Sequence, residues 1–387
     1  MNARLRIVES VPGISEEASG PSYSVVRLCQ ALIAEGEEVT LAALDLGPLG
    51  EAPAFIRTFP VGSGPRRLGR SPAMLRWLTR ANRSGEVDVL HNHGMWQMAA
   101  VYPGWVARSG KLKLVTSPRG AFSAFAMREG SSLKRLFWPL LQKPSVKRSV
   151  CFHATADAEY RDIRALGFRQ PVAVIPNGID IPATVPANAS SRRTLLYLGR
   201  IHRIKGLDRL LRGWRRVQAE FPEWDLSIAG DDLGYYGSSG YLNELKMQAS
   251  SLMVERVRFI GNVSGEQKAR VIADCEVLIL PSYSENFGVA VAEALAAARP
   301  AIVSQGAPWG GLVLNKAGWW PANEDDALVD ALRSAMRLSR EDLARMGGQG
   351  RAWMQAEFSW PRIGAMMSRT YRWIVDGGEV PSWVRLD

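Results

Sequence analysis

The stretch VLILPSYSENFGVAVAEALAAARPAIVS, residues 277–304, decides the fold. Its first four residues, Val277–Leu280, are apolar and precede a proline, which predicts a short buried strand. Small and apolar residues over Val289–Ala298 predict a helix, which Pro300 ends. The apolar run Ala301–Ser304 predicts the next strand. A strand–helix–strand unit of this kind is typical of a parallel α/β sheet.

Two carboxylates, Glu285 and Glu293, lie in this unit. Eight positions of helix would separate them by roughly 12 Å. Between them, Gly288 lets the backbone approach a ligand, and the N–H groups that open the helix present the positive end of its dipole. Taken alone, Glu285 would be interpreted as a helix cap and Glu293 as part of a solvated helix face.

Length and composition indicate a two-domain α/β protein. The chain has 387 residues, of which 47% are hydrophobic and 22% are charged, which is normal for two domains with cores of their own. No apolar run reaches the roughly 18–20 residues of a membrane span. The three cysteines lie far apart in apolar segments and without zinc-site spacing. We therefore expect reduced thiols and a cytoplasmic protein.

The positive charge is concentrated in the first half. Residues 1–187 hold 23 Lys and Arg against 15 Asp and Glu (+8), and the remainder hold 25 against 23 (+2), which gives the net charge of +10. Two segments, Arg66–Arg83 and Lys134–Arg148, combine basic residues with Trp77 and Trp138. This combination favours contact with an anionic membrane surface. Helices that pack on the core and expose a basic side to solvent would have the same sequence pattern. No nucleic-acid-binding module is visible.

The start of the chain repeats the α/β pattern, and its middle contains a domain boundary. A strand over Leu5–Val8, a Gly/Ser-rich loop and a helix over Tyr23–Ala34 open a second parallel sheet. The segment IPATVPANASS, residues 181–191, reads as a linker. We therefore predict domains over 1–185 and 192–360, followed by a closing segment over 361–387.

Several chemically active side chains follow predicted strands. The strand VDVLHNH ends in His91 and His93, which alternation places on one side. Arg119 follows the strand over Lys111–Ser117, and Arg200 and Lys205 follow another strand five positions apart. In α/β sheets, ligands bind at these carboxyl ends of strands.

Four strings, in this order, resemble retaining glycosyltransferases of family 4. They are D-V-L-H-N-H-G-M-W at 88–96, P-R-G at 118–120, G-R-x₄-K-G at 199–206 and S-E-N-F-G-x₄-E-A-L at 284–295. The resemblance covers nearly the whole chain. It implies the GT-B fold, with two doubly wound, Rossmann-like parallel-sheet domains facing a cleft and a last helix that crosses back to the first domain.

The resemblance also implies an activity and a set of site residues. The reaction would move a hexosyl unit from a nucleoside-diphosphate sugar to a hydroxyl of a glycan or polyprenyl-diphosphate-linked acceptor. This would serve cell-surface polysaccharide or lipopolysaccharide synthesis on the inner face of the cytoplasmic membrane. The implied catalytic residues are His93, Arg200, Lys205 and Glu285; the donor-binding residues are Gly20, Asn262, Val263, Asn286, Phe287, Gly288, Val289 and Glu293; and the acceptor contacts are Arg119 and Asn177.

No metal or other cofactor is expected. The chain contains no D-x-D sequence, and Arg200, Lys205 and the helix dipole at Gly288 would stabilise the charge that grows on the departing diphosphate. Two other functions remain open, a sugar-nucleotide epimerase of the same fold and a non-catalytic sugar-nucleotide-binding subunit. Incubation with donor alone separates them, because an epimerase isomerises the sugar and a binding subunit yields no product.

Overall fold

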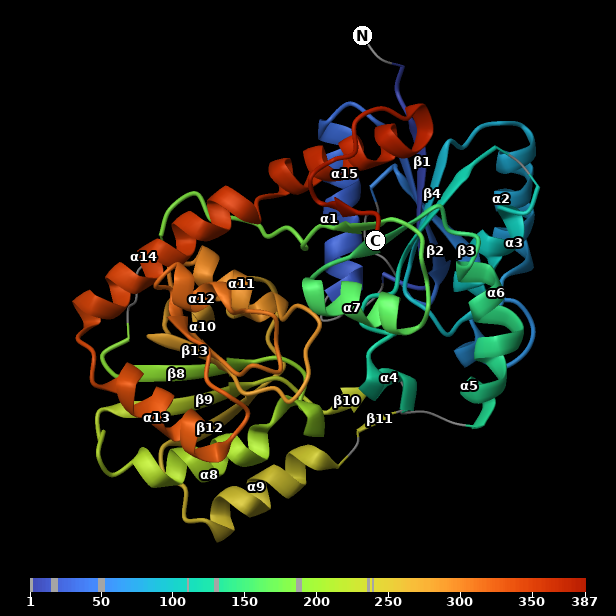
Figure 1. Ribbon diagram of the computed structural model, residues 1–387. Helices are drawn as coiled ribbons and strands as arrows, with labels where there is room; N and C mark the ends of the chain where they lie inside the picture. Colours follow the sequence, from blue (N-terminus) through green and yellow to red (C-terminus); the bar gives the residue numbers. More distant parts are fainter. Residues whose placement is uncertain are drawn as a thin grey trace. The chain divides into compact units, whose positions relative to one another are not determined.

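The computed structural model describes residues 3–14, 20–47, 53–109, 111–128, 132–185, 190–234, 237–238 and 240–387. The chain divides into two compact units (Figure 1). The first contains Met1–Gly178 and Trp360–Asp387, and the second contains Ile179–Ser359. The first boundary precedes the predicted linker, and the second lies beside the predicted closing segment.

The first unit is built on one sheet with strand order β16-β7-β6-β5-β4-β1-β2-β3, parallel except for β16. Its strands are β1 Arg6–Val11, β2 Glu38–Asp45, β3 Ile56–Pro60, β4 Val89–His93, β5 Lys113–Ser117, β6 Cys151–Ala154, β7 Val172–Val174 and β16 Val384–Arg385. Its α-helices are α1 Gly20–Ala34, α2 Pro72–Arg83, α3 Tyr102–Val106, α4 Ala124–Arg128, α5 Ser132–Phe137, α6 Lys143–Val146, α7 Asp157–Ala165 and α15 Trp360–Asp376. Short turns of other helix types are η1 Arg66–Leu68, η2 Met98–Ala100 and η3 Trp138–Gln142.

Helix α15 returns from the end of the chain to complete the first unit, where it packs on α1 (Figure 1). Ile363, Met367 and Tyr371 point into the core that β1 and α1 share. The two helices approach closely at Gly364, where an added Cβ would lie 2.9 Å from the Cβ of Ala31. The first unit therefore depends on a segment from the far end of the sequence.

The second unit contains a fully parallel sheet with order β12-β9-β8-β13-β14-β15 and a small hairpin, β10-β11. Its strands are β8 Arg193–Leu198, β9 Trp224–Ala229, β10 Leu233–Gly234, β11 Gly237–Ser238, β12 Val257–Gly261, β13 Val277–Leu280, β14 Ala301–Val303 and β15 Gly318–Trp319. Its helices are η4 Arg203–Lys205, α8 Leu207–Val217, α9 Tyr241–Ser251, α10 Gly265–Ala273, α11 Val289–Ala296, α12 Gly311–Leu314, α13 Asp325–Met336 and α14 Arg340–Glu357.

The predicted α/β class, with two Rossmann-like parallel-sheet domains, is confirmed. Strand β13 has the predicted bounds, and all of its residues are buried, as expected for a strand covered on both faces. Helix α11 ends two residues earlier than predicted, because Ala298 adopts a left-handed conformation with φ of 59°. Among the described residues, no helix is both long and apolar enough to cross a membrane.

Candidate functional site

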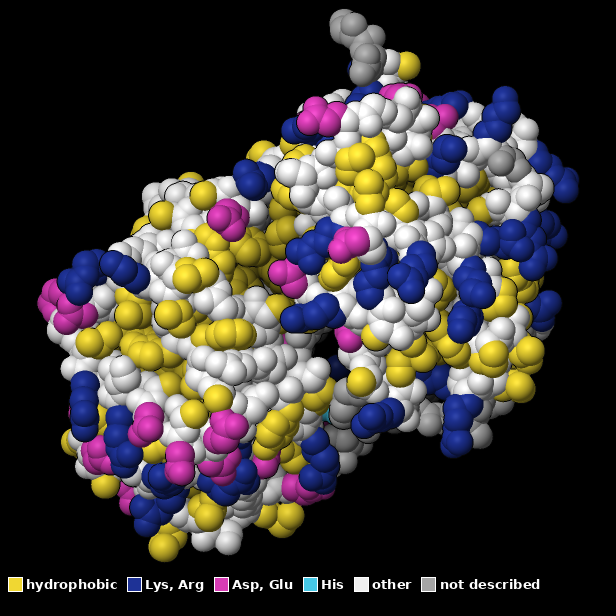
Figure 2. Space-filling model, in the orientation of Figure 1, with side chains coloured by type: hydrophobic (Ala, Val, Ile, Leu, Met, Phe, Trp, Pro, Cys, Tyr) yellow, Lys and Arg dark blue, Asp and Glu magenta, His cyan; other side chains and the backbone are white. Residues whose placement is uncertain are grey.

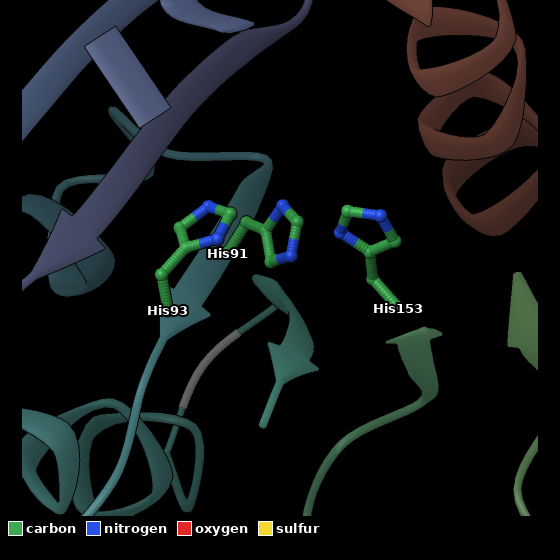
Figure 3. Close-up of side chains that lie close together, drawn as sticks. All are labelled: His91, His93 and His153. Atoms are coloured by element: carbon green, nitrogen blue, oxygen red, sulfur yellow. The ribbon is translucent and has the colours of Figure 1, made fainter. Parts of the chain in front are cut away.

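A buried cluster of histidines lies in the first unit, where β4 and β6 supply its rings. His91 and His93 stand side by side on β4, as the alternation predicts, and His153 on β6 faces them (Figure 3). All three side chains are buried, as is Glu9 on the neighbouring strand β1. Such buried polar groups persist only when hydrogen bonds satisfy them.

Both ring nitrogens of His93 have protein partners. Its Nε2 lies 2.5 Å from Oε2 of Glu9, and its Nδ1 lies 2.9 Å from Nη2 of Arg119. Because a guanidinium can only donate, Nδ1 is the acceptor, and Nε2–H donates to the carboxylate. Burial lowers the pKa of His93 well below its usual value, and the electrostatic interactions with His91 and Arg119 lower it further. The imidazole is therefore neutral. The catalytic role that the resemblance implies for His93 stays a prediction.

Glu9 is also held by the last helix of the chain. The hydroxyl of Tyr371, on α15, donates to Oε1 of Glu9 at 2.7 Å and lies 2.6 Å from Nδ1 of His91. Burial alone would raise the pKa of Glu9, but its interactions with His91 and His93 bring it below the usual value. Burial and the nearby Glu9 charge raise the pKa of Tyr371 well above its usual value.

The three imidazoles are close enough to suggest a metal site, but their hydrogen bonds do not fit one. His93 has no nitrogen left over, and Nε2 of His153 donates to the carbonyl of Ile175. Among the ring nitrogens of these three histidines, only Nε2 of His91 and Nδ1 of His153 lack a hydrogen-bond partner among the described groups. Two nitrogens are fewer than the three or four protein ligands that zinc sites use, and the adjacent Arg119 guanidinium would repel a cation. The cluster is therefore a hydrogen-bonded network.

Arg119 follows β5 in a strained turn. Its φ is 56°, an uncommon conformation for a residue other than glycine. The turn is fixed by Glu159, which accepts a hydrogen bond from the backbone N–H of Gly120 at 2.7 Å and another from Thr155. Nη1 of Arg119 donates to Oδ1 of Asn177 at 2.5 Å. The two predicted acceptor contacts, Arg119 and Asn177, are thus brought together with His93.

In the second unit, Lys205 and Glu285 form an ion pair. They follow β8 and β13, which are adjacent and parallel, so their carboxyl ends lie at one edge of the sheet. Each side chain is 16% exposed. Between these loops, Tyr283 donates its backbone N–H to the Ile204 carbonyl. Gly206 permits this closeness, because an added Cβ would lie 2.2 Å from the Pro281 carbonyl oxygen and φ is 67°.

Residues 286–289 connect this ion pair to helix α11. The backbone N–H of Asn286 donates to Oε1 of Glu285 at 3.1 Å. Trp309 donates its indole N–H to the carbonyl of Phe287. Gly288 then caps the helix in a left-handed conformation with φ of 80°, and Val289 begins it. The first N–H groups of α11 therefore open beside Glu285.

Glu293, on the same helix, pairs with Lys268 of α10, whose Nζ lies 2.5 Å from Oε1 of the carboxylate. Burial raises the pKa of Glu293, the contact with Lys268 opposes that effect, and Asp180 reinforces it. Arg200 is exposed, and its guanidinium has no ion-pair partner among the described residues. It is thus an available cation in the same loop after β8 as Lys205, whose charge Glu285 pairs.

The remaining predicted donor residues lie at other strand and helix ends. Asn262 and Val263 directly follow β12, with Asn262 exposed and Val263 buried. Gly20 is the first residue of α1, whereas a loop position was predicted; residues 15–19 of that loop lie outside the described residues.

The two basic segments differ in how their apolar residues pack. On α2, Met74 and Leu78 are buried in the core, and Trp77 packs against the same core cluster. In the second segment Trp138 also packs inward, but Leu136 and Leu140 are 59% and 62% exposed. Lys and Arg outnumber Asp and Glu on the visible face of the first unit (Figure 2). The second segment therefore has the more exposed apolar side chains, since Leu68 in the first segment is 38% exposed.

Comparisons with known proteins match both units. Residues 18–182 match the family model described as Glycosyltransferase Family 4, and residues 184–353 match Glycosyl transferases group 1. The chain is similar to phosphatidyl-myo-inositol mannosyltransferase of Mycobacterium leprae, with 26% identity over 399 residues that cover 97% of this chain and 98% of that protein. The solved sucrose-phosphate synthase from Thermosynechococcus elongatus has a TM-score of 0.76 and 20% identity, with 97% and 100% of the two chains covered. Anabaena Alr3699/HepE in complex with UDP-glucose has a TM-score of 0.70 and 17% identity, with 94% and 98% covered.

Proposed function

The chain is a hexosyltransferase with the predicted GT-B fold, and from this premise we propose that it moves a hexosyl unit from a nucleoside-diphosphate sugar to an acceptor hydroxyl with retention of anomeric configuration. The observation that carries the proposal is the meeting of Lys205, Glu285 and the start of α11 at one sheet edge. Cations and helix N–H groups at such an edge suit a diphosphate.

The ion pair gives the donor site a defined response to ligand. In the absence of donor, Glu285 neutralises Lys205. An arriving diphosphate replaces Glu285 as the partner of Lys205 and also binds the unpaired Arg200. Glu285 is then available to accept hydrogen bonds from sugar hydroxyls. Glu293 binds the ribose diol. As the bond to the sugar breaks, Arg200, Lys205 and the α11 dipole stabilise the charge that develops on the diphosphate.

We propose that this charge stabilisation operates without a divalent cation. The absence of D-x-D from the sequence supports the proposal, and the cations Arg200 and Lys205 supply the positive charge that a metal would otherwise bring. Turnover that survives excess EDTA is the expected result, and activity that returns only when Mg²⁺ or Mn²⁺ is added would refute it.

The acceptor is a glycan or a polyprenyl-diphosphate-linked oligosaccharide, used for cell-surface polysaccharide synthesis on the cytoplasmic face of the membrane. Arg119 and Asn177 contact it, and the strained turn at Arg119 supports a functional role, because strain persists where the surroundings hold it. The first unit meets the anionic membrane through Leu136 and Leu140, flanked by the exposed Arg135. Each nearby Lys or Arg adds about 1 kcal/mol to such binding.

The donor test is a thermal-shift panel of UDP-, GDP- and dTDP-sugars. UDP-glucose is the first candidate, because the Anabaena neighbour was solved with it, and GDP-mannose is the second, because the mycobacterial relative is named a mannosyltransferase. A donor at 100 times its Kd stabilises the native state by about 2.7 kcal/mol. Arg200→Ala and Lys205→Ala should lose this stabilisation and turnover, and near wild-type turnover by either would refute the diphosphate assignment.

The membrane test is co-sedimentation with anionic vesicles at low and high salt. Binding should fall with salt, because the attraction decays over about 8 Å at physiological ionic strength. Replacing Leu136 and Leu140 with serine should abolish binding. Replacing Arg76 and Arg80 with glutamate on α2, whose apolar side is buried, should weaken it only through charge. Equal loss in both variants, or no binding at low salt, would contradict this docking surface.

A further inference from the structure

Arg209 is a buried cation behind the donor site that the four sequence strings do not include. It is the third residue of α8, four positions after Lys205, and only 1% of it is exposed. Its guanidinium donates to the Pro281 carbonyl at 2.8 Å and to the Ser304 hydroxyl at 2.6 Å. It also donates to the carbonyl of Asn323 at 2.6 Å.

These partners connect three loops that follow neighbouring strands. Pro281 follows β13 and leads into the segment with Glu285, Ser304 follows β14, and Asn323 lies beyond β15. The guanidinium also lies 4.9 Å from the ring centroid of Tyr283. The arginine therefore fixes the base of the loop that carries Glu285.

The charge of Arg209 has no carboxylate in direct contact among the described residues. All of its hydrogen-bond acceptors are neutral oxygens. The nearest acidic groups on α8 and α13, Asp208 and Asp325, both pair with Arg212 instead. Arg209 also sits in the first turn of a helix, where the dipole disfavours a cation. Burial without an anion and an unfavourable helix position both cost stability.

An anion that binds nearby would offset these costs. We propose that Arg209 is a positioning residue of the diphosphate site, which holds the loop of Glu285 and stabilises bound diphosphate through its unpaired charge. This proposal rests on the proposed function, in which Lys205 and Arg200 bind that diphosphate. Arg209 itself does not touch the ligand, because its side chain is enclosed by the loops that it joins.

The test separates the charge of Arg209 from its role in packing. The full-length wild type, Arg209→Gln and Arg209→Lys are titrated by calorimetry with UDP and with uridine, and with GDP and guanosine in parallel. The ratio of nucleoside to diphosphate Kd isolates the diphosphate contribution, because both ligands need the same folded site. Arg212→Gln is the matched control, since Arg212 lies on the same helix but is more exposed and paired.

Arg209→Gln should weaken diphosphate binding about tenfold and change nucleoside binding less than about twofold. Arg209→Lys retains the charge and should keep the ratio of nucleoside to diphosphate Kd within about threefold of the wild type. If Arg209→Gln does not fold, a larger change of this ratio in Arg209→Lys would refute the proposed role of the charge. Equal losses for diphosphate and nucleoside, wild-type binding by Arg209→Gln, or the same loss in Arg212→Gln would overturn the proposal while the donor site stands. A wild type that binds diphosphate no better than nucleoside would overturn the proposed function as well.

Discussion

Replacing Lys268 with methionine should make nucleotide binding sensitive to mildly acid pH. The lysine is 32% exposed and the Glu293 side chain 15% exposed, so the substitution removes one charge and little packing. Burial raises the pKa of Glu293, and Lys268 opposes this effect. Without the lysine, the carboxylate takes up a proton at a higher pH than in the wild type. A protonated carboxyl keeps fewer acceptor positions for the ribose hydroxyls.

The magnitude follows from the contact distance and the exposure. At the 2.5 Å separation of Nζ and Oε1, two unit charges attract by roughly 1.7 kcal/mol in water and roughly 7 kcal/mol at an effective dielectric of about 20. Because about a third of the lysine is exposed, we take the low end of that range, about 1–2 kcal/mol. Affinity for nucleoside diphosphate should then fall by up to about tenfold, with a larger loss at acid than at alkaline pH, because only the protonated carboxyl binds the ribose poorly.

The assay is calorimetry with UDP or GDP from mildly acid to alkaline pH. The ratio of variant to wild-type Kd is compared at each pH, because ionisation of the ligand phosphates is common to both proteins. Arg270→Met is the control, since Arg270 lies on the same helix α10 and pairs with Glu266 on the exposed surface. A ratio that does not change with pH, or the same change in the control, would refute the reasoning.

Three further results are expected. Glu293→Gln should weaken binding of free nucleoside diphosphate, whereas Glu285→Gln should impair turnover of intact donor more; equal losses of diphosphate affinity would remove this division. Two of the buried histidines have lowered pKa values, so below about pH 6.5 the unfolded chain binds protons that the native state excludes. As the pH is lowered below this value, the free energy of unfolding should therefore fall by up to about 2.7 kcal/mol per pH unit. Urea titrations that show no such dependence on pH would contradict this expectation. Gly206→Ala should lower the free energy of unfolding by more than about 3 kcal/mol, because the added Cβ would clash with the Pro281 carbonyl oxygen. Gly261 is also left-handed but has open space around it, so Gly261→Ala should lower the free energy by about 1 kcal/mol. Equal melting temperatures for the two variants would argue against the close approach at Gly206.

The sequence was sufficient for elements whose signal is local. The apolar run of β13 and the small residues of α11 predict a strand and a helix without any information from the rest of the chain. Lys205 and Glu285 follow predicted strands, and they lie at one edge of the sheet because these strands are parallel neighbours. The paired orientation of His91 and His93 also follows from simple alternation along a strand.

Partners that come from distant segments carry no local signal. Glu9 lies just beyond the predicted strand Leu5–Val8, and nothing in the sequence relates it to Tyr371, which is 362 positions away. Lys268 and Arg209 read as ordinary residues of amphipathic helices. His153 became part of the cluster only when β6 was positioned beside β5. Such contacts depend on packing in three dimensions, which periodicity does not encode.

The return of α15 to the first unit has a consequence for the order of synthesis. The second unit is one continuous segment and is complete once Ser359 has been made. The first unit must wait for α15, so Glu9 and His91 emerge early but lack the Tyr371 hydroxyl until residue 371 has left the ribosome. During that interval the apolar face of α1 is uncovered. Nascent chains halted before Trp360 should therefore recruit chaperones and be cut readily by proteases, whereas the second unit within them should already resist digestion.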